Sequence, residues 1–301
     1  MTVPPSNGGA RIPLRPTLLE AAATLAAAGV HSPRVDAEYL AAHVLGVQRP
    51  RLALVPMLTP EQLGEFRTLV ARRAERVPLQ HLTGVAAMGE VELAVGPGVF
   101  VPRPETELLF AWALAQLEAA GHAHAPVVVD LCTGSGALAL AVAHARPDAE
   151  VHAIELDPAA LAWARRNAER QAAQGDTPIT LHAGDVTDPR ALADLDGRVD
   201  VVVANPPYIP VTAELEPEVL HHDPHAALFG GPDGLSVIEP MIGTIARLLS
   251  TGGVTAVEHD DSHGSRVSGL FAAHGGFTDI AEHPDLAGRP RFVVARRVRA
   301  D

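Results

Sequence analysis

A short segment after a strongly apolar stretch carries residue types that could do chemistry. Residues 201–204 are Val-Val-Val-Ala, and Asn205, Pro206, Pro207 and Tyr208 follow them directly. Proline cannot continue a strand, because it lacks an N–H donor and fixes its own φ. The pattern therefore predicts a buried strand that stops abruptly and presents an amide, two rigid rings and a phenol at its tip.

This tip could hold a planar nitrogen group, either a carboxamide or an aromatic amine. The lone pair of such a nitrogen is delocalised, so it reacts only when both N–H bonds are fixed and the lone pair is aimed. The Asn205 side-chain oxygen and the Pro206 carbonyl could accept the two hydrogens, while the rings of Pro207 and Tyr208 cover the planar face. Positioning of this kind can lower a barrier by about 7–11 kcal/mol. The predicted catalytic residues are Asn205, Pro206 and Tyr208, all four residues bind substrate, and no metal is required.

A second segment, VVVDLCTGSGALALAVA, places Gly134, Ser135 and Gly136 between a predicted strand and a predicted helix. Parallel sheets bind nucleotides at such a turn, where glycine lets the backbone approach the ligand closely. Glu155 lies at the end of the next strand, where an acid suits the two hydroxyls of a ribose. Asp185, after the third strand, is placed to meet the amino group of an adenine.

Two kinds of cofactor fit this turn. Ala139 completes a Gly-x-Gly-x-x-Ala pattern, which also occurs in dinucleotide-binding dehydrogenases. Asp130, just before the loop, would repel a pyrophosphate but suits a free ammonium group, such as the methionine end of S-adenosylmethionine. No Asn-Pro-Pro-Tyr is expected at the fourth strand of a dehydrogenase. We therefore predict S-adenosylmethionine as the cofactor and S-adenosylhomocysteine as its product.

The elements that position these residues form a helical segment followed by an α/β segment. Across 17–84, Ser or Thr followed by apolar residues with a period of 3.6 predicts four or five short helices, the first capped by Thr17. Residues 87–108 predict a hairpin that turns at 96–98, and a helix follows from Glu105 to Ala120. Near-continuous apolar strands then alternate with helix-length segments, which indicates a parallel sheet covered on both faces.

The predicted strands cover residues 125–132, 149–156, 177–185, 199–208, 252–260 and 289–299, with a late helix at 265–274. The predicted domain plan is a disordered tail over 1–15, a helical domain over 16–86, a hairpin linker over 87–108 and an α/β domain over 109–301.

Composition restricts the class of protein and its place in the cell. The 301 residues carry a formal net charge of −13 at pH 7, which disfavours non-specific binding to phosphate backbones. No apolar run reaches the roughly 18 residues that span a membrane, and the N-terminal residues lack the apolar region of a signal peptide. Cys132 is the single cysteine, which suits a reducing cytoplasm. We expect a cytoplasmic protein with no direct nucleic-acid or membrane partner.

Several segments together resemble one family. Besides the Asn-Pro-Pro-Tyr tip and the glycine loop, they are VPLQHLTG (77–84), GVFVPRPETELL (98–109), HDPHAALFGGPDGL (222–235) and DLAGRPRFVVAR (285–296). Over about residues 17–297 the sequence is similar to the HemK/PrmC family, which methylates N5 of the glutamine in the Gly-Gly-Gln motif of class 1 peptide chain release factors. The resemblance implies a Rossmann-like methyltransferase domain, a helical domain that docks the release factor, and a role in translation termination.

The resemblance also implies residue roles. Together with Asp130, the cofactor-binding residues would be Cys132, Thr133, Gly134, Ser135, Gly136, Glu155, Asp185, Val186 and Asn205. The sequence departs from the family pattern at His81, at Met88 and at Val186, and VEHDDSHG (257–264) replaces a Glu-x-Gly-x-x-Gln-Gly pattern.

Three other functions remain open. The same tip could methylate a glutamine of another protein, such as a ribosomal one, or an adenine amino group in DNA or RNA. The chain could also be a binding module that keeps the fold without the activity.

Other chemistry-bearing residues receive plainer interpretations. Neither of the two histidine- and acid-rich sets has a zinc spacing. We predict a solvated loop for His221, His222 and His225, and a loop at a strand end for Glu258, His259, Asp260, Asp261 and His263. Cys132 is predicted to be a small packing residue. Arg103 is predicted to pair with Glu105 or Glu107 in a loop that closes over the site.

Overall fold

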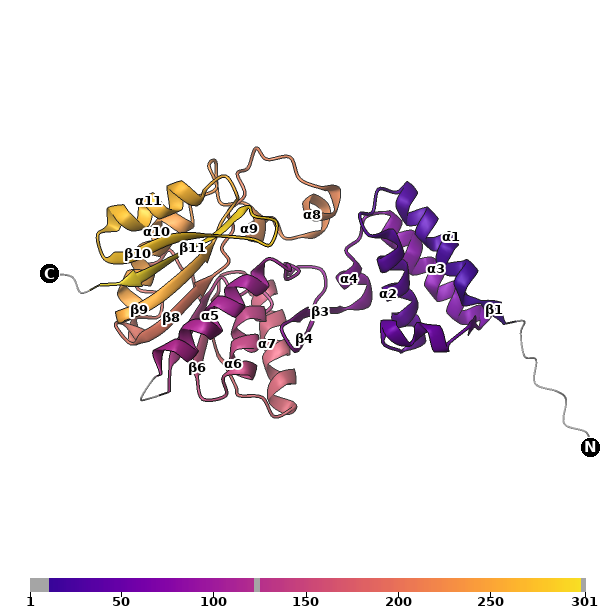
Figure 1. Cartoon of the computed structure of the whole chain (residues 1–301), viewed down its shortest axis with the longest axis horizontal. Coiled ribbons are helices and arrows are strands. Elements are labelled where there is room, and N and C mark those ends of the chain that lie inside the picture. The colour runs from indigo at the N-terminus through magenta and orange to yellow at the C-terminus, as the bar shows by residue number, and fades with distance from the viewer. Residues whose placement is uncertain (1–10, 122–124, 299–301) are drawn as a thin grey trace, which may run out of the picture. The chain divides into compact units, whose positions relative to one another are not determined.

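The computed structural model describes residues 11–121 and 125–298, and the chain divides into two compact units (Figure 1). The first unit contains the residues up to Gly84 together with Glu216–His222. The second contains Val85–Leu215 and the residues from Asp223 onward. In the described ranges, no helix combines the length and the hydrophobicity needed to span a lipid bilayer.

The first unit is a bundle of short helices. Its elements are β1 (Ile12–Pro13), α1 (Leu14–Ala27), α2 (Pro33–Leu45), the 3₁₀ helix η1 (Arg49–Leu54), β2 (Met57–Leu58), α3 (Pro60–Ala74), α4 (Leu79–Thr83) and α8 (Pro217–His222). Leu25 and Phe66 are among the fully buried side chains of its core. The predicted helix starts are confirmed at Ser32–Pro33 and Thr59–Pro60, and Gln62 completes a capping box with Thr59.

The first helix begins earlier than the sequence pattern predicts. Thr17 is not its N-cap, because α1 starts at Leu14 and the Thr17 hydroxyl donates to the Pro13 carbonyl at 2.9 Å. Residues 1–10 of the expected disordered tail lie outside the described part of the chain, but β1 and α1 occupy residues 12–15. Leu14 is buried, and this apolar contact extends the helix beyond the capping pattern.

A buried arginine joins three helices of the first unit. Arg73 on α3 is 6% exposed. Its Nε lies 2.7 Å from Asp36 Oδ2 on α2, and its Nη1 lies 2.8 Å from Glu218 Oε2 on α8. A buried cation is tolerated when its charge is paired. These ion pairs therefore hold the segment 216–222 to the helical unit.

The second unit is built on a seven-stranded sheet with the order β10-β11-β9-β8-β5-β6-β7. Its strands are β5 (Val127–Leu131), β6 (Glu150–Glu155), β7 (Thr180–Ala183), β8 (Val199–Ala204), β9 (Leu249–Glu258), β10 (Phe277–Pro284) and β11 (Pro290–Arg297). The strands from β9 to β7 are parallel to one another, whereas β11 runs antiparallel to both of its neighbours, β9 and β10. The predicted α/β class is confirmed. β10 was not predicted, because this edge strand has mostly exposed side chains and no apolar run.

Helices cover both faces of this sheet (Figure 1). One face carries α5 (Thr106–Ala120), α6 (Ala137–Ala145), α7 (Pro158–Ala173) and the hairpin of β3 (Val85–Met88) and β4 (Val91–Ala94). The other carries α10 (Ile238–Leu248) and α11 (Gly264–His274). The remaining elements are the 3₁₀ helix η2 (Ala193–Leu195) and α9 (His225–Leu228). Strand side chains alternate between the two cores, as Val128 and Val129 do on β5.

The hairpin is shorter than predicted and turns at a different place. β3 and β4 pair across a turn at 89–90, whereas the predicted turn at 96–98 lies beyond β4. Gly96 instead makes room for the side chain of Trp163. A Cβ at position 96 would lie 2.8 Å from that indole ring, so this glycine is required by packing and not by a hairpin turn.

Asn167 on α7 connects the hairpin to the glycine loop. The side chain is fully buried. Its Oδ1 accepts the Ala94 N–H at 2.8 Å, and its Nδ2 donates to the carbonyls of Ala94 at 3.0 Å and Ser135 at 2.9 Å. One side chain therefore satisfies backbone groups of β4 and of the loop that follows β5.

We expect Asn167→Ala to destabilise the second unit. The substitution removes the partner of buried backbone groups at Ala94 and Ser135, and each unsatisfied group costs about 1–3 kcal/mol. For a unit of this size, thermal unfolding should show a melting temperature lower by about 2–4 °C per kcal/mol lost. Arg165→Ala, exposed on the same helix, is the matched control. Equal melting temperatures for the two variants would contradict this role.

Candidate active site

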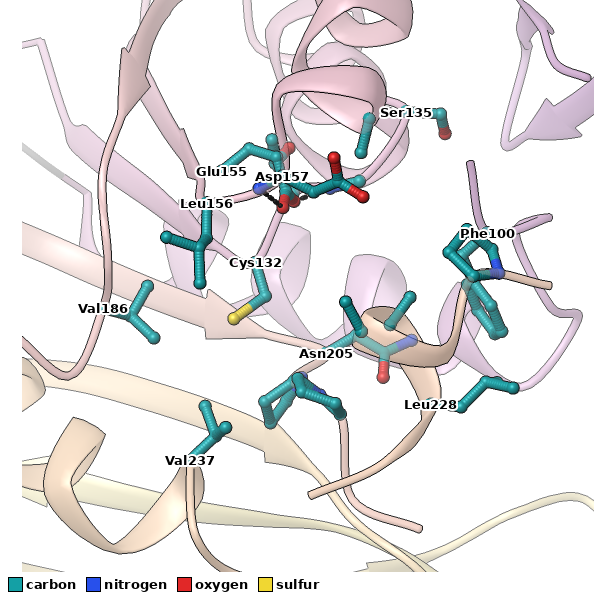
Figure 2. Close-up of a pocket in the computed structure, with 18 of the residues that line it drawn as sticks. Phe100, Cys132, Ser135, Glu155, Leu156, Asp157, Val186, Asn205, Leu228 and Val237 are labelled. Atoms are coloured by element: carbon teal, nitrogen blue, oxygen red, sulfur yellow. Dashed lines mark hydrogen bonds between the residues drawn. The ribbon is translucent and has the colours of Figure 1, made fainter. Parts of the chain in front are cut away.

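The carboxyl ends of four parallel strands meet around one cavity of about 600 Å³ in the second unit (Figure 2). β8, β5, β6 and β7 contribute Asn205, Asp130, Glu155 and Asp185. The other predicted residues that line it are Cys132, Thr133, Gly134, Ser135, Val186, Pro206, Pro207 and Tyr208. Gly136 is the N-cap residue of α6 and does not line the cavity. Parallel sheets bind ligands at this edge, and the structure brings the predicted residues together there.

The loop from Cys132 to Gly136 has an unusual backbone that Glu155 supports. Its φ angles are +61° at Cys132, +58° at Gly134 and +85° at Gly136, a region that glycine enters without steric cost. The Glu155 carboxylate on β6 accepts the N–H groups of Gly134 at 2.8 Å and Asp157 at 2.9 Å. Burial raises the pKa of Glu155. The loop and Glu155 therefore form one preorganised element.

Asp130 places a carboxylate beneath this loop. Its Oδ2 accepts the Thr133 hydroxyl at 2.6 Å and the Ala139 N–H at 3.2 Å. Its Oδ1 is buried, and none of the described residues donates a hydrogen bond to it. Burial raises the pKa of Asp130 to about 7, against the opposing effect of the two hydrogen bonds. A buried oxygen without a donor is costly, which indicates a place for a cationic group of a ligand.

Cys132 and Asp185 complete this half of the cavity. Burial raises the pKa of the Cys132 thiol, and the carboxylates of Glu155, Asp130 and Asp185 act in the same direction. A thiol that stays protonated is a poor nucleophile. Asp185 Oδ1 accepts the N–H and the hydroxyl of Thr187 at 2.8 Å and 2.7 Å, so a local turn fixes the carboxylate at the cavity wall.

Two side chains that sequence reasoning missed hold the Asn-Pro-Pro-Tyr tip. Asn205 Nδ2 donates to Thr106 Oγ1 at 3.1 Å, and the Tyr208 hydroxyl donates to Glu258 Oε1 at 2.9 Å. The Thr106 hydroxyl in turn donates to Glu258 Oε2 at 3.0 Å. Figure 2 shows Asn205 among the lining side chains, between Cys132 and Leu228. The tip is therefore braced from α5 and from β9.

The segment 229–234, Phe-Gly-Gly-Pro-Asp-Gly, packs directly on the backbone of the tip. A Cβ at Gly230 would lie 2.5 Å from the Pro207 carbonyl oxygen, and a Cβ at Gly234 would overlap the Tyr208 carbonyl. Only glycine permits so close an approach. These glycines therefore shape the tip, which explains why a segment remote in sequence belongs to the site.

Arg103 pairs with Asp223. The predicted pairing with Glu105 or Glu107 is therefore wrong. The Asp223 carboxylate is almost completely buried, so its charge needs a partner. The Arg103 guanidinium also lies 4.9 Å from the centre of the Phe100 ring. Phe100 lines the cavity, and the pair therefore shapes one wall of it.

The first histidine-rich set does not form the solvated loop that we expected, whereas the second lies at the end of β9 and in the loop that follows it, as predicted. Residues 221–222 end α8, and His225 begins α9. In the second set Glu258, His259 and His263 are buried. Glu258 follows an apolar strand as Glu155 does, and that parallel is the sequence signal that could have identified it. Across the described residues, no group of three or more potential ligands is arranged to hold a metal ion.

Comparison with known proteins places these features in a family. The PrmC N-terminal domain family matches residues 17–84, and the methyltransferase small domain family matches residues 104–222. The release factor glutamine methyltransferase of Mycolicibacterium smegmatis is 56% identical over 285 residues, covering 95% of this chain and 98% of that protein. The protein of the same name from Mycobacterium tuberculosis H37Rv is 52% identical over 288 residues, covering 94% and 91%.

Solved structures of other methyltransferases are also similar. The T. thermophilus 16S rRNA N2 G1207 methyltransferase RsmC, in complex with AdoMet and guanosine, matches with a TM-score of 0.48 and 23% identity. The match covers 71% of this chain and 49% of that one. The family follows from the relatives that match at 56% and 52% identity over nearly their whole length: the chain belongs to the release factor glutamine methyltransferase family.

Proposed function

We propose that the protein transfers a methyl group from S-adenosylmethionine to the side-chain amide nitrogen of the Gly-Gly-Gln glutamine in class 1 release factors. The observation that carries the proposal is the orientation of Asn205. Because its Nδ2 donates to Thr106, its Oδ1 is the end of the amide left to accept a hydrogen from a substrate amide. The names of the relatives at 56% and 52% identity support the same substrate.

The residues around the cavity fit S-adenosylmethionine. Asp130 offers the cofactor ammonium a buried oxygen to which none of the described residues donates a hydrogen bond. Glu155 keeps lone pairs for the ribose hydroxyls, since each carboxylate oxygen can accept more than one hydrogen bond. Asp185 and Val186 would contact the adenine. When bound, the cofactor supplies an electrophilic methyl group on a sulfonium and leaves as S-adenosylhomocysteine.

The contribution of the chain to the reaction is orientation. The Asn205 oxygen and the Pro206 carbonyl accept the two N–H hydrogens of the glutamine amide. The rings of Pro207 and Tyr208 cover its plane, so the nitrogen lone pair points toward the methyl group. The nitrogen gains the methyl group and loses one proton to solvent, and no side chain acts as a nucleophile. Such positioning can supply about 7–11 kcal/mol.

We assign docking of the release factor to the helical unit. Its match to the PrmC N-terminal domain family supports this assignment. The unit also exposes large apolar side chains, which are frequent at protein interfaces: Leu19 at 56%, Tyr39 at 45% and Leu54 at 78%. Translation termination places such a partner, and hence this enzyme, in the cytoplasm, where a single free cysteine is stable.

The alternatives differ in how well the chain suits them. A glutamine in another protein, such as a ribosomal one, presents the same chemistry to the tip. An adenine amino group is also planar, but a net charge of −13 disfavours a nucleic-acid substrate. A binding module without activity would not need Asp130, Glu155 and Asn205 together.

Labelled cofactor identifies the substrate directly. We expect incubation with methyl-labelled S-adenosylmethionine and a purified class 1 release factor, followed by peptide mapping, to place the label on the Gly-Gly-Gln glutamine. A release factor with alanine in place of that glutamine is the control and should stay unlabelled. Label in DNA, RNA or a ribosomal protein, with none in the release factor, would contradict the proposal.

We expect Asn205→Ala to remove most of the turnover while the cofactor stays bound. The variant lacks the acceptor that orients the substrate amide, and loss of one group from a preorganised site lowers kcat by about 10²–10³. Tyr208→Phe keeps the covering ring and should cost less. The measurement is single-turnover methyl transfer at saturating cofactor. If Asn205→Ala keeps more than about a third of the wild-type rate, the residue does not orient the substrate amide as proposed.

A further inference from the structure

The carboxyl group of Glu258 is buried behind the tip and has no part in the reaction described so far. The residue is 1% exposed and ends β9. β9 is the parallel neighbour of β8, with Val257 opposite Ala204, so Glu258 lies level with the start of the tip. Its two oxygens accept the hydroxyls of Thr106 and Tyr208. Both bonds lead back to the tip.

An ionised Glu258 carboxylate sets the donor and the acceptor in each hydrogen bond from Glu258 through Thr106 to Asn205. A carboxylate can only accept, so the Thr106 hydroxyl must use its single hydrogen on Glu258. The Thr106 oxygen can then only accept from the next group, which is Asn205. Asn205 must therefore turn its NH₂ toward Thr106, and its Oδ1 takes the opposite position on the planar amide. The orientation required for an amide substrate follows from a charge two hydrogen bonds away.

We propose that Glu258 is a positioning residue that acts through Thr106 to fix which atom of the Asn205 amide faces the substrate, and through the Tyr208 hydroxyl to fix the covering ring. This inference rests on the proposed methylation of an amide nitrogen. It assigns the tip an internal support that is separate from the cofactor-binding carboxylates.

The charge state of Glu258 decides whether this support operates. Burial raises the pKa of Glu258 to about 7, while the hydrogen bonds from Tyr208 and Thr106 and the charge of Arg291 on β11 lower it. Glu105, which precedes α5, raises it. These groups come from α5, β11 and the segment after β8.

Protonation of Glu258 reverses the direction of the hydrogen bonds that link it through Thr106 to Asn205. A neutral Glu258 can donate to Thr106, whose hydroxyl is then free to donate to Asn205, and the amide can turn its oxygen away from the substrate. The competent form is the ionised one. The rate of methyl transfer should therefore rise with pH through about 7, and it should fall as the pH drops and Glu258 becomes protonated.

A titration without substrate tests the bond direction by itself. The chain has three asparagines, Asn7, Asn167 and Asn205, so selective ¹⁵N-asparagine labelling yields few side-chain NH₂ signals, and Asn205→Ala assigns the relevant pair. We expect this pair to shift with a transition near pH 7. The transition should disappear in Glu258→Gln and persist in Glu239→Gln, an exposed glutamate on α10. No transition between about pH 5 and pH 9 in the wild type, where Glu258 should titrate, would overturn the proposal. So would an unchanged transition in Glu258→Gln.

Kinetics test the consequence for catalysis. Glu258→Gln and Thr106→Val should each lower kcat by about 10-fold to 100-fold, as expected for a misplaced orienting group, with cofactor Kd unchanged. Thr106→Ser restores the hydroxyl and should recover most of the rate lost in Thr106→Val. The double variant of Glu258→Gln and Thr106→Val should be no slower than the slower single variant, because both residues act through the same series of hydrogen bonds to Asn205.

Additive losses in the double variant would overturn the proposal, as would equal rates for Thr106→Ser and Thr106→Val. If Glu258→Gln does not fold, the Thr106 variants still decide the question. If the wild type methylates no release factor, the proposed function fails. The NMR titration still reports on Glu258 in that case.

Discussion

Burial of negative charge along one edge of the sheet is the constraint on which this site depends. Asp130, Glu155 and Glu258 lie at or next to the ends of β5, β6 and β9, and burial raises the pKa of all three. Asn205 follows β8, which lies between β5 and β9. Apolar packing cannot satisfy these oxygens. The glycine loop, the start of α5 and the tip itself each contribute donors to them, so the architecture of the site follows from satisfying the strand ends.

The buried carboxyl groups on the two sides of this edge differ in their hydrogen-bond partners. This difference suits the cofactor on one side and the substrate amide on the other. Asp130 keeps a buried oxygen without a donor among the described residues, and that side suits a cationic cofactor. Both oxygens of Glu258 are satisfied by hydroxyl groups, and the positive charge of Arg291 acts on it as well. That side therefore suits orientation of a neutral amide. One sheet edge thus provides a place for positive charge next to a place where hydrogen-bond direction is fixed.

The parts of the site that the sequence predicts are those with a local signal. Asp130, Glu155 and Asn205 could be placed because each adjoins an apolar strand, and parallel strands end at one edge. Glu258 also adjoins an apolar strand, but its contact with the tip depends on the register of β9 beside β8. The contact of Thr106 depends on how α5 packs, which no local pattern records. The partner of Arg103 and the turn at 89–90 depend on tertiary packing in the same way. The early start of α1 reflects burial of Leu14, which a capping pattern does not record.

Proton linkage to cofactor binding tests most directly whether buried charge is the basis of the site. In calorimetry of S-adenosylhomocysteine in buffers of different ionisation enthalpy, a pKa of about 7 for Asp130 predicts release of most of one proton at pH 6.5. At pH 9 Asp130 is already ionised in the free protein, and the fraction of the ligand's α-amino group that is neutral should instead take up a proton to pair with this carboxylate. A reversal of sign between the two pH values would support the account. Binding heats that do not depend on the buffer at pH 6.5, or proton release at both pH values, would contradict it.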